Sequence, residues 1–273
     1  MTRTFGLAAA LLLLLAIPLG AQQVSEQRVR AAIDDASRGL GQVVGGGSAL
    51  TGPAATTGGL GHFMLGASVS ATGVEVEDPR RPQGNVDVIL PVGTIYGALG
   101  ITEGGPSGLG AIDLVGRAGP VVAREEYGDN RMLYSLGARI GLLREGALAP
   151  SLSATLSRTW LDQLEYGDLN GDEVSFQADV HVTSARLEVS KGFLLATPYA
   201  GVGLHRAGIE ADYRIPATRS TGNSEITGSV DSSDTHSVAY GGVEFALALV
   251  ATSVEIGFYD GGAFAAIGVH ANF

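Results

Sequence analysis

Alternation of apolar and polar residues is the feature that most limits what this chain can fold into. Between residues 149 and 161, Leu152, Ala154, Leu156 and Trp160 alternate with serine or threonine. Successive side chains of a β-strand point to opposite faces, so this segment is predicted to be a strand with one apolar and one polar face. An α-helix would space its apolar residues three or four positions apart instead.

The same alternation recurs along the chain, in segments separated by turn-forming residues. The predicted strands lie near 62–75, 85–99, 109–122, 131–144, 149–161, 174–190, 196–213, 235–250, 252–260 and 263–273. Charged residues make up only 16% of the chain and the mean hydropathy is +0.23. Beyond the N-terminus, however, no segment reaches the roughly 18 uncharged apolar residues that a transmembrane helix needs. An all-β fold, a transmembrane antiparallel β-barrel of about ten strands (range about 8–12), reconciles these facts because its apolar surface takes every second position.

The N-terminus has the pattern of a secretory signal peptide. Arg3 precedes an apolar run from Leu7 to Ile17, and small residues follow up to Ala21. The run is short for a membrane-spanning helix, so we expect cleavage after Ala21, with a retained anchor as the alternative. The absence of cysteine excludes a lipid-modified cysteine and disulfides. The predicted organisation is a signal peptide at 1–21, a leader at 22–61 and a barrel at 62–273.

The predicted leader combines a short helix with a glycine-rich tail. Ser25 can cap a helix over residues 24–40, whose apolar stripe comprises Val29, Ala32, Ile33, Ala36 and Leu40. Residues 41–61 are mostly Gly, Ser, Thr and Ala and have little apolar surface to bury. The leader is therefore either a flexible periplasmic segment or a plug that folds back into the barrel.

The last strand carries a second signal. Ala265, Ile267 and Val269 share one face, and the chain stops on Phe273. This ending resembles the closing strand of bacterial outer-membrane β-barrels, whose C-terminal aromatic residue is recognised by the barrel-assembly machinery. The stretch Leu187–Phe193 followed by Thr197–Gly203 is similar to a hairpin of uncharacterised barrel families with an N-terminal helical leader. The resemblance implies location in the outer membrane, outer-membrane lipid and the assembly machinery as partners, and Phe273 as the assembly signal.

The connections have the asymmetry of such a barrel, with short periplasmic turns and longer polar external loops. With a periplasmic C-terminus, the external connections are 76–84, 123–130, 162–173, 214–234 and 261–262, and the periplasmic ones are 100–108, 145–148, 191–195 and 251. Aromatic residues near strand ends are expected to form interfacial girdles. They are Phe63, Tyr127, Trp160, Phe176, Tyr199, Tyr213, Tyr259, Phe264 and Phe273.

Charged residues on the polar faces are predicted to point into the lumen. They are Asp113, Arg117, Arg139, Asp179, His181, Glu244, Glu255 and His270. A ten-stranded barrel is little wider than the eight-stranded kind that side chains fill. These groups therefore form either a packed network of ion pairs, since a lone buried charge is costly, or a narrow polar conduit.

Patterns for catalysis and metal binding are weak. His236 and Ser237, near Asp231 and Asp234, are the best hydrolase candidates, but a loop rich in serine produces such neighbours by chance. Oxygen-bearing side chains alternate in 168–172 as in calcium loops, yet the sixth position is Glu173 instead of glycine, so calcium there stays open. We predict no catalytic residues, no metal site and no cofactor. The net charge of −11 argues against nucleic acid as a partner.

The sequence therefore predicts an outer-membrane barrel that acts as a narrow passive channel or transporter for small molecules, with no substrate identified. One alternative is a non-transporting barrel that stabilises the envelope or binds a partner. An outer-membrane lipid hydrolase is a third hypothesis.

Overall fold

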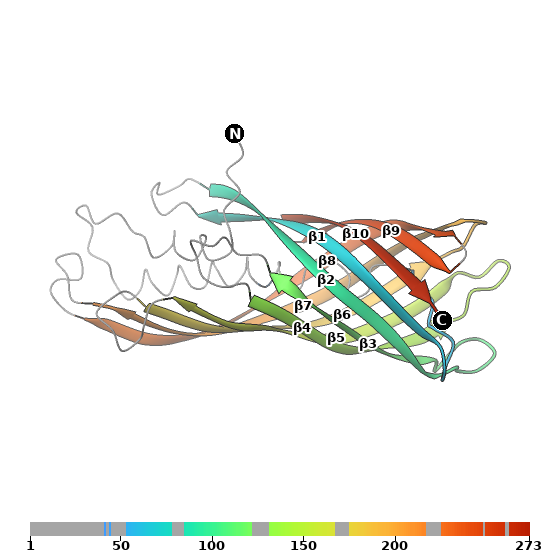
Figure 1. Cartoon of the computed structure of the whole chain (residues 1–273), viewed down its shortest axis with the longest axis horizontal. Coiled ribbons are helices and arrows are strands. Elements are labelled where there is room, and N and C mark those ends of the chain that lie inside the picture. Colours follow the sequence, from blue (N-terminus) through green and yellow to red (C-terminus); the bar gives the residue numbers. More distant parts are fainter. Residues whose placement is uncertain are drawn as a thin grey trace.

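The strands form a closed antiparallel barrel, in which each strand pairs with its sequence neighbours and β1 pairs with β10 (Figure 1). The computed structural model describes residues 41, 44, 53–77, 85–121, 131–166, 175–216, 225–247, 249–259 and 262–273. Among these residues, no helix is both long and apolar enough to cross a membrane. The predicted fold class is confirmed. The predicted signal peptide, the helix over 24–40, Tyr127 and the calcium candidate 168–172 lie outside the described residues.

Ten strands are present in the described part of the chain. They are β1 (Phe63–Glu77), β2 (Asn85–Thr102), β3 (Ile112–Val121), β4 (Arg131–Leu143), β5 (Ser151–Tyr166), β6 (Ser175–Ser190), β7 (Ala196–Ile215), β8 (Ile226–Leu247), β9 (Val250–Tyr259) and β10 (Gly262–Asn272). The largest departure from the prediction is β8, which begins nine residues before the expected start at 235. The predicted loop 214–234 was wrong, because β7 and β8 stay paired out to Ile215 and Ile226. The turn expected at 251 is also displaced, since Ala251 lies within β9.

Four consecutive strands are longer than most of the others. β5 to β8 contain 16, 16, 20 and 22 residues, whereas β3 and β9 contain 10 each. Their far ends extend beyond β3 and β4, at the end of the barrel opposite the C-terminus (Figure 1). We call this part the projection and define it as residues 159–166, 175–182, 207–215 and 226–234.

Apolar side chains cover the outside of the rest of the barrel. We call this outer surface the belt; it includes Leu65, Val69, Ile95, Leu136, Leu156, Leu187, Val202, Leu204, Val254, Ile256, Ile267 and Val269, all of which are exposed. Soluble proteins rarely expose so large a contiguous apolar surface. An apolar outer band is what a membrane-spanning barrel presents to lipid. The apolar faces predicted for 149–161 and 263–273 point outward, at Leu156 and Ile267, and Leu136 on β4 is likewise exposed.

The projection has the opposite arrangement. Val180, Val182 and Ile209 point inward and are buried, whereas Asp179 and Glu210 are exposed on the outside. Asp179 and His181 were predicted to point inward, which places their neighbours Val180 and Val182 outward, toward lipid, and this prediction was wrong. The outer part of β6 lies beyond the belt, where the apolar face turns away from the outer surface.

Glycine makes room for aromatic rings on the inner wall. Tyr199 lies opposite Gly242, and Tyr240 lies opposite Gly201, on the adjacent strands β7 and β8. A Cβ atom at Gly201 would lie 2.4 Å from the Tyr240 ring, and one at Gly242 would lie 2.5 Å from the Tyr199 ring. Each tyrosine therefore packs flat over the backbone of the next strand, which only glycine permits.

Some of the aromatic residues expected in the interfacial girdles are instead inside the barrel. Tyr199, Tyr213, Tyr259 and Phe264 are buried. Phe63, Trp160 and Phe273 are exposed on the outside, and the rings of Phe63 and Phe273 stack with centroids 4.8 Å apart where β1 meets β10. Sequence proximity to a strand end did not separate the two groups, because the facing of a side chain depends on the register of its strand.

Candidate functional site

The barrel interior collects most of the charged residues predicted to face the lumen. Asp113, Arg117, Arg139, Glu244, Glu255 and His270 lie on the inner wall, each with 8% or less of its surface exposed. Asp179 is exposed and His181 half-buried on the outer face of β6, so the predicted inward position was wrong for these two. Both lie in or next to the part of β6 where the inner face is apolar.

An ion pair on the inner wall holds the chain that precedes β1. The Nε and Nη2 atoms of Arg139 donate to one oxygen of Asp113 over 3.0 and 2.8 Å. The same carboxylate accepts hydrogen bonds from the backbone N–H of Thr57 over 3.1 Å and from its hydroxyl over 2.8 Å. Arg139 also donates from Nη1 to the carbonyl oxygen of Pro53 over 3.4 Å. Thr57 is thus attached to the β3–β4 wall.

Three further contacts place earlier residues inside the barrel. The backbone N–H of Ala54 donates to the Ser190 hydroxyl over 3.1 Å, and Arg117 donates from Nη2 to the carbonyl of Val44 over 2.7 Å. Val44 is fully buried. Gly41 approaches β7 so closely that a Cβ atom on it would lie 2.3 Å from Cβ of Ala207. The described residues before β1 therefore contact the inner wall at several heights, from Ser190 near the C-terminal end to Ala207 in the projection.

A second polar network lines β6, β7 and β8. The Tyr240 hydroxyl donates to Glu188 over 2.6 Å, and the Arg186 guanidinium lies 5.5 Å from the centre of the Tyr240 ring. Arg186 also donates from Nε to Nε2 of His205 over 3.1 Å. The sequence prediction missed Arg186 and Glu188 because they share a face with Val180 and Val182, which had been assigned to lipid.

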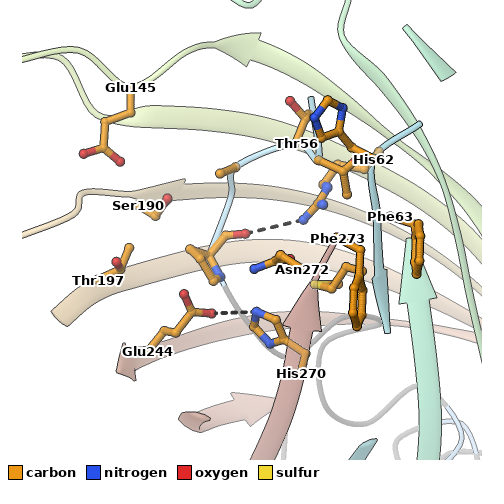
Figure 2. Close-up of a pocket in the computed structure, with 15 residues that line it drawn as sticks. Thr56, His62, Phe63, Glu145, Ser190, Thr197, Glu244, His270, Asn272 and Phe273 are labelled. Carbon is orange, nitrogen blue, oxygen red and sulfur yellow. Dashed lines mark hydrogen bonds and ion pairs between the residues drawn. The ribbon is translucent and has the colours of Figure 1, made fainter. Parts of the chain in front are cut away.

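Glu244 and His270 form a third pair, nearer the C-terminal end. His270 Nε2 lies 3.3 Å from a Glu244 carboxylate oxygen, and His270 Nδ1 lies 3.4 Å from the Tyr96 hydroxyl. The pair faces a cavity of about 460 Å³ at the barrel mouth (Figure 2). The lining of this cavity includes Thr56, Thr57, His62, Arg139, Glu145, Ser190, Thr197 and Phe273. Residues before β1 thus form one wall of the cavity and the barrel forms the others.

The hydrolase candidate does not assemble. His236 is buried on the inner face of β8, whereas the next residue, Ser237, is exposed on the outer face. A histidine that activates a serine must reach its hydroxyl, which this alternation prevents. Within the described ranges, no group of three or more His, Asp or Glu side chains is arranged to hold a metal ion.

Comparisons with known proteins give structural neighbours only. No protein-family model matches the chain. No curated protein matches it either. Among solved structures, it is similar to the outer membrane protease OmpT from Escherichia coli, with 12% identity, 78% of this chain and 96% of that chain covered, and a TM-score of 0.42.

Two other structural neighbours are the transport unit of an autotransporter and a surface protein. The transport unit of the autotransporter AIDA-I from Escherichia coli has 12% identity and a TM-score of 0.43, with 88% of this chain and 99% of that chain covered. Neisserial surface protein A has 11% identity and a TM-score of 0.32, with 78% and 99% covered. Their functions are not carried over to this chain, whose fold follows from its own strand pairing.

Proposed function

We propose that this protein is an outer-membrane β-barrel that acts as a narrow channel for small polar solutes and is plugged by its own N-terminal segment. One observation carries the proposal: Asp113, on the barrel wall, binds Thr57 through both the backbone N–H and the hydroxyl of that residue. A segment that served only as a tether would not need partly buried hydrogen bonds to the wall. The apolar belt supports the location.

A plugged channel needs a polar bore and a surface against which the plug can pack, and the barrel interior has both. Its wall in the belt region is polar, with Arg117, Arg139 and Glu244 pointing inward, so a bore left by the plug would hold water. On β6 and β7 the inner face of the projection is apolar, with Val182 and Ile209 buried. The apolar stripe predicted for residues 24–40 is suited to cover such a surface.

Deletion of residues 24–58, with the signal peptide retained, tests the proposal in planar lipid bilayers. We expect a folded barrel with larger or more frequent single-channel openings than the full-length chain. The conductance should stay small, because side chains of a ten-stranded wall still occupy the bore. Folding is checked independently by the difference in gel mobility between unheated and boiled samples, which a closed barrel shows in detergent.

A milder variant separates the plug from the wall without deleting it. Thr57→Val removes the hydroxyl that donates to Asp113 and leaves the barrel intact, so the open probability should rise. Thr102→Val is the matched control, because the Thr102 hydroxyl donates over 2.7 Å to the Gly110 carbonyl in an exposed turn at the same end. Equal open probabilities of the Thr57→Val and Thr102→Val variants would contradict the proposal that the N-terminal segment is a plug.

The second candidate function is a closed barrel with a structural or binding role. The network of Arg186, Glu188, His205 and Tyr240 favours it, because this network links β6, β7 and β8 across the inner wall. The same recordings decide between the two. If both the full-length chain and the folded deletion variant stay closed, the structural role replaces transport.

A further inference from the structure

The outer surface changes from apolar to polar along a row of residues on β5 to β8. Arg158, Thr183, Arg206 and Thr235 lie opposite one another on these strands, with all four side chains on the outside. On the C-terminal side of the row, the neighbouring outward residues on β5 to β7 are Leu156, Ala185 and Leu204 of the belt. On the other side the projection begins. The row thus marks the boundary between lipid and water on this side of the barrel.

The two arginines of this row are exposed. Among the residues that the structure describes, no carboxylate forms an ion pair with Arg158 or Arg206. Glu210, on the same face of β7 as Arg206, is four residues further along, which is roughly 13 Å in an extended strand. Two positive charges without a carboxylate partner among the described residues are unusual at the edge of an apolar surface in a chain with a net charge of −11.

Two aromatic rings, Trp160 and His181, lie next to this row. The Arg158 guanidinium lies 5.8 Å from the centre of the Trp160 ring, an arrangement that stabilises the cation and restricts the side chain. His181 lies opposite Trp160, and its ring covers Gly208, where an added Cβ atom would lie 2.6 Å from His181 Nε2. Tryptophan favours the level of lipid headgroups, because one part of the ring is apolar and the N–H is polar.

We propose that Arg158 and Arg206 bind the phosphate of a phosphorylated lipid headgroup in the outer leaflet. Two strand spacings separate them, roughly 10 Å between Cα atoms, so their long side chains can converge on one phosphate above Thr183. Guanidinium groups bind phosphate with paired hydrogen bonds, and the Thr183 hydroxyl lies between them as a further donor. The acyl chains of the same lipid would lie along Leu156, Ala185 and Leu204. The proposal uses the orientation with a periplasmic C-terminus and is independent of channel activity.

Trp160 is the only tryptophan in the chain and lies beside the proposed site, so its fluorescence reports binding directly. The full-length mature protein, folded in detergent micelles, is titrated with lipid A carrying its phosphates and, separately, with dephosphorylated lipid A. We expect a saturable emission change with the phosphorylated lipid only. Inorganic phosphate at millimolar concentration should neither produce the change nor compete, because it lacks the acyl chains that contact the belt.

Substitutions at the two arginines test the assignment. The Arg158→Gln/Arg206→Gln double variant should bind the phosphorylated lipid roughly 30-fold more weakly, at about 1 kcal/mol per arginine near an anionic surface. Arg206→Gln alone should weaken it about 5-fold on the same basis and leaves the Arg158–Trp160 contact unchanged. Arg144→Gln is the matched control, an exposed arginine at the C-terminal end that donates to the Glu103 carbonyl over 2.9 Å.

Three outcomes would overturn the proposal. They are equal binding of dephosphorylated lipid A, competition by inorganic phosphate alone, and unchanged affinity of Arg206→Gln relative to Arg144→Gln. Each variant is first checked for the heat-dependent gel shift of a folded barrel. If the double variant does not fold, the single Arg206→Gln variant still tests the proposal, because it changes only one side chain that points outward.

Discussion

The belt and the projection use the same strands with opposite polarity. On β7, the outward residues Ala200, Val202 and Leu204 are apolar within the belt, whereas Glu210 and Asp212 are charged within the projection. The inward residues change in the other direction, from His205 to Ile209. Backbone pairing with β6 and β8 continues across the change without a register shift. The geometry of the strand is therefore constant, and what changes is the polarity of the residues on each face.

This comparison shows that a strand's alternation fixes two faces but not which face points inward. Where the outer medium is lipid, the apolar face turns outward and the polar face is hydrated or paired inside. Where the outer medium is water, the apolar face turns inward as in a soluble protein. A single strand can satisfy both rules by changing its composition at the boundary.

The largest effect is expected from the polar interior of the belt region. Asp113→Ala leaves the buried Arg139 guanidinium unpaired and removes the acceptor for Thr57, so unfolding in urea should be easier by about 3–5 kcal/mol. Glu103→Ala is the control, because Glu103 is exposed and only 3.9 Å from Arg144, a surface pair worth at most about 1 kcal/mol. Similar losses in the two variants would mean that the belt interior is as hydrated as the surface.

The next largest effect is expected when an arginine is placed on β7, and two substitutions compare the belt with the projection on this strand. Val202→Arg puts a charge on the lipid face and should cost roughly 2–4 kcal/mol near the bilayer midplane. Glu210→Arg puts the same side chain on the same face of β7 in the projection and should change stability by less than about 0.5 kcal/mol. Folding titrations in lipid vesicles measure both. Equal costs would show that the projection is also surrounded by lipid.

The smallest effect is expected from a substitution on the inner face of the projection. Ile209 is 1% exposed, so Ile209→Val should leave a small cavity and destabilise the protein by about 0.5–1.5 kcal/mol. Ile256→Val removes the same methyl group from the lipid face of the belt, where acyl chains fill the space, so its cost should be smaller. A larger loss at Ile256 would contradict the assignment of the apolar core of the projection.

The residues of the candidate site could be predicted only on strands whose apolar face points outward along their whole length. Arg139 was assigned to the lumen correctly because its strand, β4, has an outward face of Tyr134, Leu136 and Ile140 throughout. Arg186 and Glu188 were missed because β6 crosses the boundary, and its valines suggested the wrong lipid face. Thr57 and Ser190 carry no sequence signal, since small polar residues are as common in exposed loops as at buried contacts.

By itself, the sequence determined the strand class and nearly all strand positions. Alternation over ten segments, without a helix-length apolar run, leaves a closed sheet as the way to pair every backbone group in lipid. Tertiary structure alone decided the facing of β6, the length of the β7–β8 hairpin and the contact of Thr57 with Asp113. These depend on where the membrane boundary cuts each strand and on register between neighbours, and both are set by pairing between residues far apart in the chain.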